Sequence, residues 1–232
     1  NGQILKVERA KYLLEETQAG ARKPRKQYMG ELIEMDASSL VWVQGKGKWH
    51  LHLAVDDATG EIVGAYFDAQ ETLHAYYMVL KQIIQGYGIP LTFRTDRRTC
   101  FEYSLRNDAV ASQAGRSRRK PRELLEDEEP ALTNFGIALG RLGVDLHSSS
   151  EPLFKSRIDR LNYTLQCRLP VDLKRANIQT MEEANAFLPD YIKHLNRMFS
   201  LKTEKDAEDN VFVPGPSAEE LNLILSVRVQ RV

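Results

Sequence analysis

Residues 49–67, WHLHLAVDDATGEIVGAYF, contain the pattern that decides the fold class. Two short segments rich in β-branched and aromatic residues, 49–55 and 61–67, flank the polar stretch DATG at 57–60. Such segments are typical of strands, and Asp, Thr and Gly are typical of the turn that joins them. The pattern predicts two consecutive antiparallel strands.

Neighbouring segments extend this sheet and add a helix. Residues 31–36, ELIEMD, predict a first strand, which makes a three-stranded meander with the two above. Over residues 71–87 apolar residues recur at helical spacing, and Pro90 prevents the helix from continuing. LTFRT at 91–95 then predicts a fourth strand. We expect a layered α/β or α+β domain.

The second half of the chain is predicted to be mainly helical. Residues 131–142 form a helix before a short strand at 144–147, and residues 156–168 and 181–199 form two further helices. The helix that begins at residue 156 has an apolar face and a polar face. The apolar face comprises Ile158, Leu161, Leu165 and Leu169, and the polar face comprises Asp159, Asn162, Tyr163 and Gln166.

The composition excludes some classes of protein. An apolar fraction of 42% excludes a wholly disordered chain, and no apolar run approaches the ~18 residues of a membrane span. The 2 cysteines are too few for a disulfide framework, and neither has metal-binding spacing. We therefore expect a soluble globular protein of the cytoplasm with reduced thiols.

The charge of the chain is balanced in total but not along its length. The 32 Lys and Arg residues equal the 32 Asp and Glu residues in number, which would ordinarily argue against a nucleic-acid partner. However, the basic run GRSRRKPR at 115–122 is followed at once by the acidic run ELLEDEE at 123–129. The net charge of zero therefore results from basic and acidic segments that cancel each other, and it does not exclude DNA binding.

Three acidic residues have positions that suit a metal site. Asp36 ends the first predicted strand, Asp96 follows the fourth, and Asp159 lies near the start of a helix. Carboxylates that converge need a cation between them, and a hard divalent cation prefers oxygen ligands. Two such ions can clamp the attacking and leaving oxygens of a phosphodiester. From these residues alone, solvated surface acids and helix caps are the alternative interpretation.

Four stretches of the chain are similar to one known family. They are GELIEMDA at 30–37, HLAVDDATG at 52–60, TDRR at 95–98 and KSRIDRLNYTLQCRLPVDLKRANIQTMEEANAFL at 155–188. Together they resemble the integrase-core (DDE) catalytic domain of bacterial insertion-sequence transposases, in the retroviral-integrase-like superfamily. The resemblance implies an α/β, ribonuclease-H-like fold with a mixed five-stranded sheet, three strands antiparallel and two parallel, flanked by helices.

The resemblance also implies the chemistry. The family carries a DDE triad that binds Mg²⁺ or Mn²⁺, and it performs metal-dependent DNA 3′-end cleavage and strand transfer, the steps of DNA integration and transposition. Asp36 and Asp96 match its two aspartates as catalytic residues and metal ligands. Asp159 matches the position of its glutamate and is shorter by one methylene, and Glu151 in the preceding loop is an alternative ligand.

Two alternatives to this function remain open. One is a catalytically weakened or inactive integrase-like module that binds DNA without cutting it. The other is a ribonuclease-H-type nuclease that hydrolyses DNA without strand transfer. Metal-stimulated cleavage that Asp36→Asn abolishes would separate the enzymes from the binding module.

The resemblance implies DNA as the partner, both transposon ends and target, and no membrane. Because strand transfer joins DNA ends, we expect a homo-oligomer in the active complex and a nucleoid-associated location in the bacterial cytoplasm. Basic and polar side chains around Asp159 and in the charged insertion are expected to contact DNA, mainly through its phosphates. They are Lys155, Arg157, Arg160, Asn162, Arg116, Arg118, Arg119 and Lys120.

Three regions are expected along the chain. Residues 1–28 are a helical and basic N-terminal appendage with a linker. Residues 29–200 are the integrase catalytic core, and residues 103–130 are a charged insertion within it. Residues 201–232 are a linker and the start of a C-terminal segment.

Two further pairs of residues resemble ligands but have simpler interpretations. Asp56 and Asp57 follow a strand, where a role in the turn is favoured over metal binding. His50 and His52 alternate on one strand without a third ligand at suitable spacing, so we expect exposed strand positions.

Overall fold

A five-stranded mixed sheet forms the centre of the computed structural model, which describes residues 25–95, 102–103, 131–148, 156–200 and 210–226. The strand order is β3-β2-β1-β4-β7. The first three strands are antiparallel, and β4 and β7 add in parallel. The strands are β1 (Ile33–Leu40), β2 (Trp49–Asp56), β3 (Ile62–Asp68), β4 (Thr92–Thr95) and β7 (Asp145–Ser148). The predicted sheet of three antiparallel and two parallel strands is confirmed.

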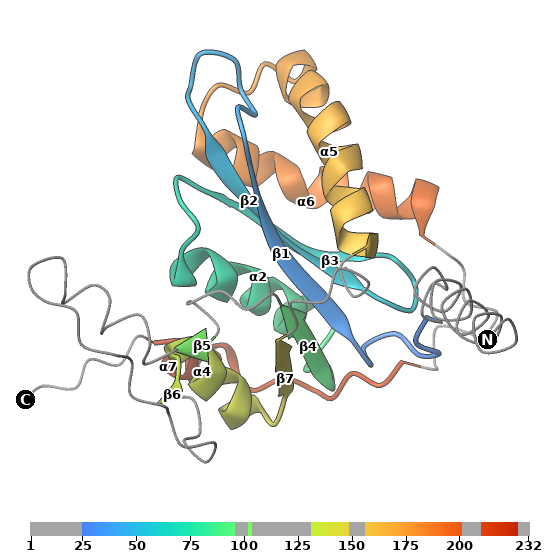
Figure 1. Cartoon of the computed structure of the whole chain (residues 1–232), viewed down its shortest axis with the longest axis vertical. Coiled ribbons are helices and arrows are strands. Elements are labelled where there is room, and N and C mark those ends of the chain that lie inside the picture. The colour runs from blue at the N-terminus through green and yellow to red at the C-terminus, as the bar shows by residue number, and fades with distance from the viewer. Residues whose placement is uncertain (1–24, 96–101, 104–130, 149–155, 201–209, 227–232) are drawn as a thin grey trace, which may run out of the picture.

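Helices cover both faces of this sheet (Figure 1). On one face lie α2 (Leu73–Gly86) and α4 (Asn134–Leu142), and on the other lie α5 (Ser156–Arg175) and α6 (Met181–Phe199). A short helix, α7 (Ala218–Ile224), joins the first layer, and β5 (Glu102–Tyr103) pairs with β6 (Ala131–Leu132). Within the described parts of the chain, no helix has the length and apolar character needed to cross a membrane.

Each face of the sheet has its own apolar core, because side chains alternate along a strand. In β1, Ile33, Met35 and Ala37 enter the core under α2 and α4. The opposite core, under α5 and α6, contains Trp42 and Trp49, whose rings form T-shaped pairs with Phe67 at centroid distances of 5.4 and 5.9 Å. Strands buried on both sides explain the nearly continuous apolar runs of β2 and β3.

Two elements run further than the sequence predicted. β1 continues past Asp36 to Leu40, which pairs with Trp49, so Asp36 lies in the middle of the strand and not at its end. α5 continues past residue 168 to Arg175, because Leu169 and Leu173 extend its buried face by a further turn. In both cases contacts with a neighbouring element extend the strand or helix beyond the residues that the local sequence pattern predicts.

Residues 210–226 pack against the edge of the first layer. Val213 and Ile89 exchange two backbone hydrogen bonds of 2.8 and 2.9 Å, and Val211 donates to the Met29 carbonyl at 2.9 Å. Gly88, at φ +114°, allows this close approach, since a Cβ there would lie 2.5 Å from the Val213 carbonyl oxygen. Leu221 of α7 is fully buried in the core under α2 and α4.

Candidate functional site

The first turns of α5 lie against β1 at the position of Asp36. Asn162, of which 5% is exposed, donates from Nδ2 to Asp36 Oδ2 at 3.1 Å. This bond joins two short side chains, so the backbones of the helix and the strand are close at this point. It fixes one side of the half-buried Asp36 carboxylate.

Asp159 lies one turn before Asn162 on α5. Residues three apart on a helix share a face and differ by about 4.5 Å along its axis. Asp159 is exposed, whereas its neighbour Ile158 is buried under the helix. The structure thus places two of the three predicted acids, Asp36 and Asp159, on elements in direct contact, with Asn162 bonded to Asp36 and one turn from Asp159.

The third predicted acid, Asp96, lies outside the described residues. The strand that precedes it, β4, ends at Thr95 and pairs in parallel with β1, with Glu34 opposite Arg94. Among the described residues, no group of three or more His, Cys, Asp or Glu side chains could hold a metal ion.

Several other predicted contacts also lie outside the described residues. They are Glu151, Lys155, Arg116, Arg118, Arg119 and Lys120. The remaining members of the predicted DNA-binding set, Arg157, Arg160 and Asn162, all belong to α5, but they do not share one environment.

Arg157 forms an ion pair with Asp57, at the turn between β2 and β3. Asp57 is almost fully buried, and its other carboxylate oxygen accepts the Lys26 backbone N–H at 2.8 Å. Asp56 beside it accepts the N–H groups of Gly30 and Thr59 at 2.9 and 2.8 Å. The predicted role of Asp56 and Asp57 in the turn is confirmed.

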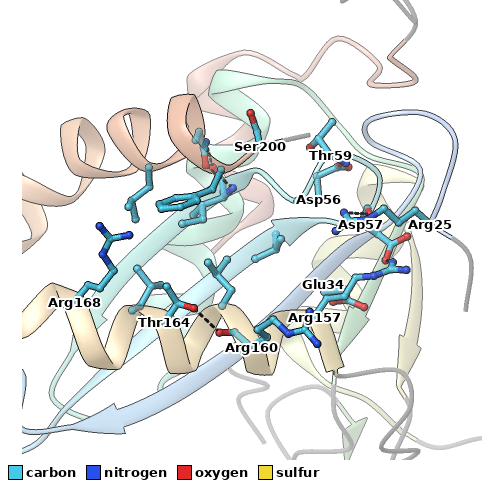
Figure 2. Close-up of a pocket in the computed structure, with 18 of the residues that line it drawn as sticks. Arg25, Glu34, Asp56, Asp57, Thr59, Arg157, Arg160, Thr164, Arg168 and Ser200 are labelled. Carbon is cyan, nitrogen blue, oxygen red and sulfur yellow. Dashed lines mark hydrogen bonds and ion pairs between the residues drawn. The ribbon is translucent and has the colours of Figure 1, made fainter. Parts of the chain in front are cut away.

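A pocket of about 350 Å³ opens between α5, α6 and the β2–β3 turn (Figure 2). Arginines from the linker and α5 line it together with acids of the sheet and an apolar wall. The charged residues are Arg25, Arg157, Arg160, Arg168, Glu34, Asp56 and Asp57, and the apolar wall includes Val55, Ile62, Leu161, Leu165, Leu195 and Phe199. Arg157 and Arg160 therefore face this pocket, whereas Asn162 faces Asp36.

Glu34 is a charged residue of this region that the sequence analysis missed. It is 3% exposed, and its Oε1 accepts from Arg94 Nη1 at 3.2 Å, whereas no described group bonds to Oε2. Burial raises the pKa of Glu34 to about 7, and the nearby Asp57 acts in the same direction. The sequence could have indicated this residue, because Glu34 lies two positions before Asp36 in the same strand and alternate residues of a strand share a face.

The prediction that His52 is exposed was wrong. His52 is fully buried, its ring forms a T-shaped pair with Tyr76 at a centroid distance of 4.7 Å, and Nδ1 donates to the Tyr66 carbonyl at 3.3 Å. Burial lowers the pKa of His52 to about 4. The cause is the position of β2 inside the sheet, where helices cover both faces, so alternation does not expose every second residue.

Comparisons with known proteins relate the chain to transposases. No family model matches the sequence. The chain is 47% identical over 210 residues to "Transposase for insertion sequence IS1202" of Streptococcus pneumoniae, which covers 90% of the chain and 41% of that relative. It is 29% identical over 209 residues to "Putative transposase y4bF" of Sinorhizobium fredii (strain NBRC 101917 / NGR234), with coverage of 89% and 41%. The chain therefore spans about two fifths of the length of these relatives.

The fold has counterparts among solved structures. A chain in the cryoEM structure of the simian T-cell lymphotropic virus intasome, in complex with PP2A regulatory subunit B56 gamma, superposes with a TM-score of 0.54. The match covers 84% of this chain and 60% of the other at 15% sequence identity, so it shows the fold alone. Together these findings confirm the resemblance: the chain is related to insertion-sequence transposases over part of their length and has the ribonuclease-H-like α/β fold of integrase catalytic cores.

Proposed function

We propose that this chain is the catalytic core of an insertion-sequence transposase that cleaves DNA 3′ ends and transfers them to target DNA. Asp36, Asp96 and Asp159 are its catalytic carboxylates. The observation that supports this most is the bond between Asn162 and Asp36, because it holds the helix that carries Asp159 against the strand that carries Asp36.

The donor set fits a hard divalent cation, Mg²⁺ or Mn²⁺. All three proposed ligands are carboxylates, and oxygen ligands are what these ions prefer. When bound, the cation would supply Lewis-acid stabilisation of charge on the phosphodiester oxygens. No serine, cysteine or tyrosine nucleophile is required for such a transfer.

The protein residues at this site orient the carboxylates. Asn162 holds one oxygen of Asp36 through its amide N–H, which limits rotation of the carboxylate about its χ2 angle. The buried Ile158 fixes the rotation of α5, so that Asp159, about 100° further around the helix axis, is exposed. Both side chains are thereby presented from rigid elements, which is what in-line phosphoryl transfer requires.

DNA would be held by basic side chains, with transposon ends and target as the two substrates. We keep Lys155, Arg160 and the basic run that contains Arg116, Arg118, Arg119 and Lys120 as phosphate contacts. Joining of two DNA ends requires two active sites in one complex, so the active form is a homo-oligomer. Its location is then the bacterial cytoplasm, at the nucleoid.

Nicking of supercoiled plasmid DNA in the presence of Mn²⁺ tests the proposal. Asp36→Asn and Asp159→Asn should each lower the rate by about 100-fold or more, because misplacement of a catalytic group by about 1 Å is that costly. Asp145→Asn is the matched control, since Asp145 is an exposed aspartate at the edge strand β7. Equal rates for all three variants would contradict the proposed site.

A second assay separates transfer from hydrolysis. A labelled oligonucleotide with a free 3′ end is incubated with target plasmid, and joined products are detected by their altered mobility. Joined products that require Asp36 support a transposase. Cleavage without joining would assign a nuclease, and DNA binding without any metal-stimulated cleavage would assign a binding module.

A further inference from the structure

We propose that Asp57 and Arg157 are a positioning pair that fixes the first turn of α5 and thereby places the carboxylate of Asp159. This inference rests on the proposed function, in which Asp159 is a metal ligand. It gives Arg157 a role inside the protein in place of the DNA contact expected from the sequence.

The first support is the way Asp57 itself is held. Its backbone N–H donates to the Leu32 carbonyl at 3.0 Å, just before β1 begins. Its Oδ2 accepts the Lys26 N–H, and Arg25 Nη1 donates to its carbonyl oxygen at 3.0 Å. Asp57 is therefore attached to the sheet and to the linker, and its remaining carboxylate oxygen, Oδ1, pairs with Arg157.

The second support is the position of Arg157 on α5. It precedes Asp159 by two residues, and Asn162 follows Asp159 by three. Two polar contacts with the sheet region therefore bracket Asp159 over about 7.5 Å of helix axis: Arg157 with Asp57, and Asn162 with Asp36. Because the first turn of a helix lacks a full set of intrahelical bonds, loss of the first contact would leave Asp159 on a fraying end.

The third support is the burial of this pair. The side chain of Asp57 is 4% exposed and that of Arg157 is 26% exposed, so solvent screens their interaction much less than it screens a surface ion pair. Both line the pocket of Figure 2, whereas Asn162 does not line it. A buried ion pair of this kind can fix the position of the first turn of α5. The exposed ion pair between Lys193 and Asp190 on α6 is too weak to fix the position of its helix.

The test measures Mn²⁺ affinity from the electron paramagnetic resonance signal of the free ion, with the full chain and without DNA. Asp57→Asn and Arg157→Met should each weaken binding by about 10- to 100-fold, as loss of groups that orient metal ligands does. The double variant should be no weaker than the single ones, because both remove the same contact. Arg157→Lys, which keeps a cation, should recover part of the loss.

Asp172→Asn is the matched control on the same helix. Asp172 accepts hydrogen bonds from the Tyr191 hydroxyl at 3.0 Å and from Arg175 at 3.3 Å, near the other end of α5. Its replacement should lower the melting temperature and leave Mn²⁺ affinity unchanged. Amide hydrogen exchange should quicken in the first turn of α5 in Asp57→Asn and not in Asp172→Asn.

The outcomes distinguish this inference from the proposed function. If Asp36→Asn abolishes Mn²⁺ binding while Asp57→Asn and Arg157→Met stay within about twofold of the wild type, the positioning role is refuted and the metal site stands. An equal loss of affinity in Asp172→Asn, or additive losses in the double variant, also refutes it. If Asp36→Asn leaves Mn²⁺ binding unchanged, the proposed function itself fails.

Discussion

Replacement of Leu221 by alanine tests whether residues 210–226 belong to the folded core. Leu221 is fully buried among residues of β1, α2 and α4, although it lies 21 residues beyond residue 200, where the expected catalytic core ends. The matched control is Leu223→Ala, because Leu223 is on the same helix and is 69% exposed. Both substitutions leave the Ser217 and Glu220 capping box of α7 intact.

The size of the effect follows from burial. A buried Leu→Ala change costs about 2–5 kcal/mol, and the lower part of this range applies because the neighbours Ile224 and Leu225 are only partly buried and can relax into the space. We expect a loss of about 2–3 kcal/mol, which for a domain of this size lowers the melting temperature by about 5–10 °C. Leu223→Ala should change stability by less than about 0.5 kcal/mol.

Urea denaturation followed by tryptophan fluorescence is the assay, since Trp42 and Trp49 are both buried in the core under α5 and α6. Leu221→Ala should shift the midpoint without changing the slope of the transition, which reports the surface exposed on unfolding. Equal stabilities of the two leucine variants would refute the reasoning, and residues 210–226 would then be no part of the cooperative unit. If the prediction holds, a chain that ends at residue 200 will be destabilised.

Three other substitutions have expected outcomes that follow from the structure. The pKa of His52 is about 4 in the folded state and about 6.5 in the unfolded state, so the unfolded state binds more protons between these pH values. The free energy of unfolding should therefore fall by up to about 3 kcal/mol as the pH decreases from 7 to 4. The buried Glu34, whose pKa is raised, changes stability with pH in the opposite direction. The contribution of His52 is therefore the difference in unfolding free energy between the wild type and His52→Phe, measured by urea titration at each pH. If the two plots of unfolding free energy against pH are parallel, the prediction is contradicted. Asn162→Ala should weaken Mn²⁺ binding by about 10-fold or more by releasing Asp36, and unchanged affinity in the same resonance assay would contradict that role. Asp159→Glu should lower the rate of Mn²⁺-dependent nicking, and a faster variant would show that the native acid is too short.

The sequence predicted the layers of this fold because they depend on local pattern. Segments rich in β-branched and aromatic residues indicated the strands of the meander, and helical spacing predicted α6 with its observed bounds, Met181–Phe199. The exposure of His52 was mispredicted because it depends on what covers the other face of β2, which is a helix elsewhere in the chain. The end of β1 was mispredicted because pairing with β2 continues through Ser38 and Ser39 although neither has a strong strand preference.

The environment of Arg157 shows what part of a site local sequence can and cannot define. Residues two apart on a helix lie about 200° apart around its axis, so Arg157 cannot share a face with Asp159, and this much was available from the spacing. Its partner Asp57 is 100 residues away and in another element, and only the packing of α5 on the sheet brings them together. The proximity of Arg157 to Asp159 in sequence therefore placed Arg157 at the correct end of α5, but it did not identify Asp57 as its partner.

The length of the third acid can be reconciled with a working site by the same packing. A glutamate reaches about 1.5 Å further than an aspartate, so an aspartate serves only where its helix lies closer to the strand. Asn162 and Asp36 are both short side chains, and they meet directly at 3.1 Å, which sets a small separation between α5 and β1 one turn from Asp159. With Arg157 tied to Asp57 on the other side of Asp159, the helix cannot move outward to accommodate a longer acid. In the proposed site the aspartate therefore matches the position of its helix, and we expect Asp159→Glu to impair this site and not to restore it.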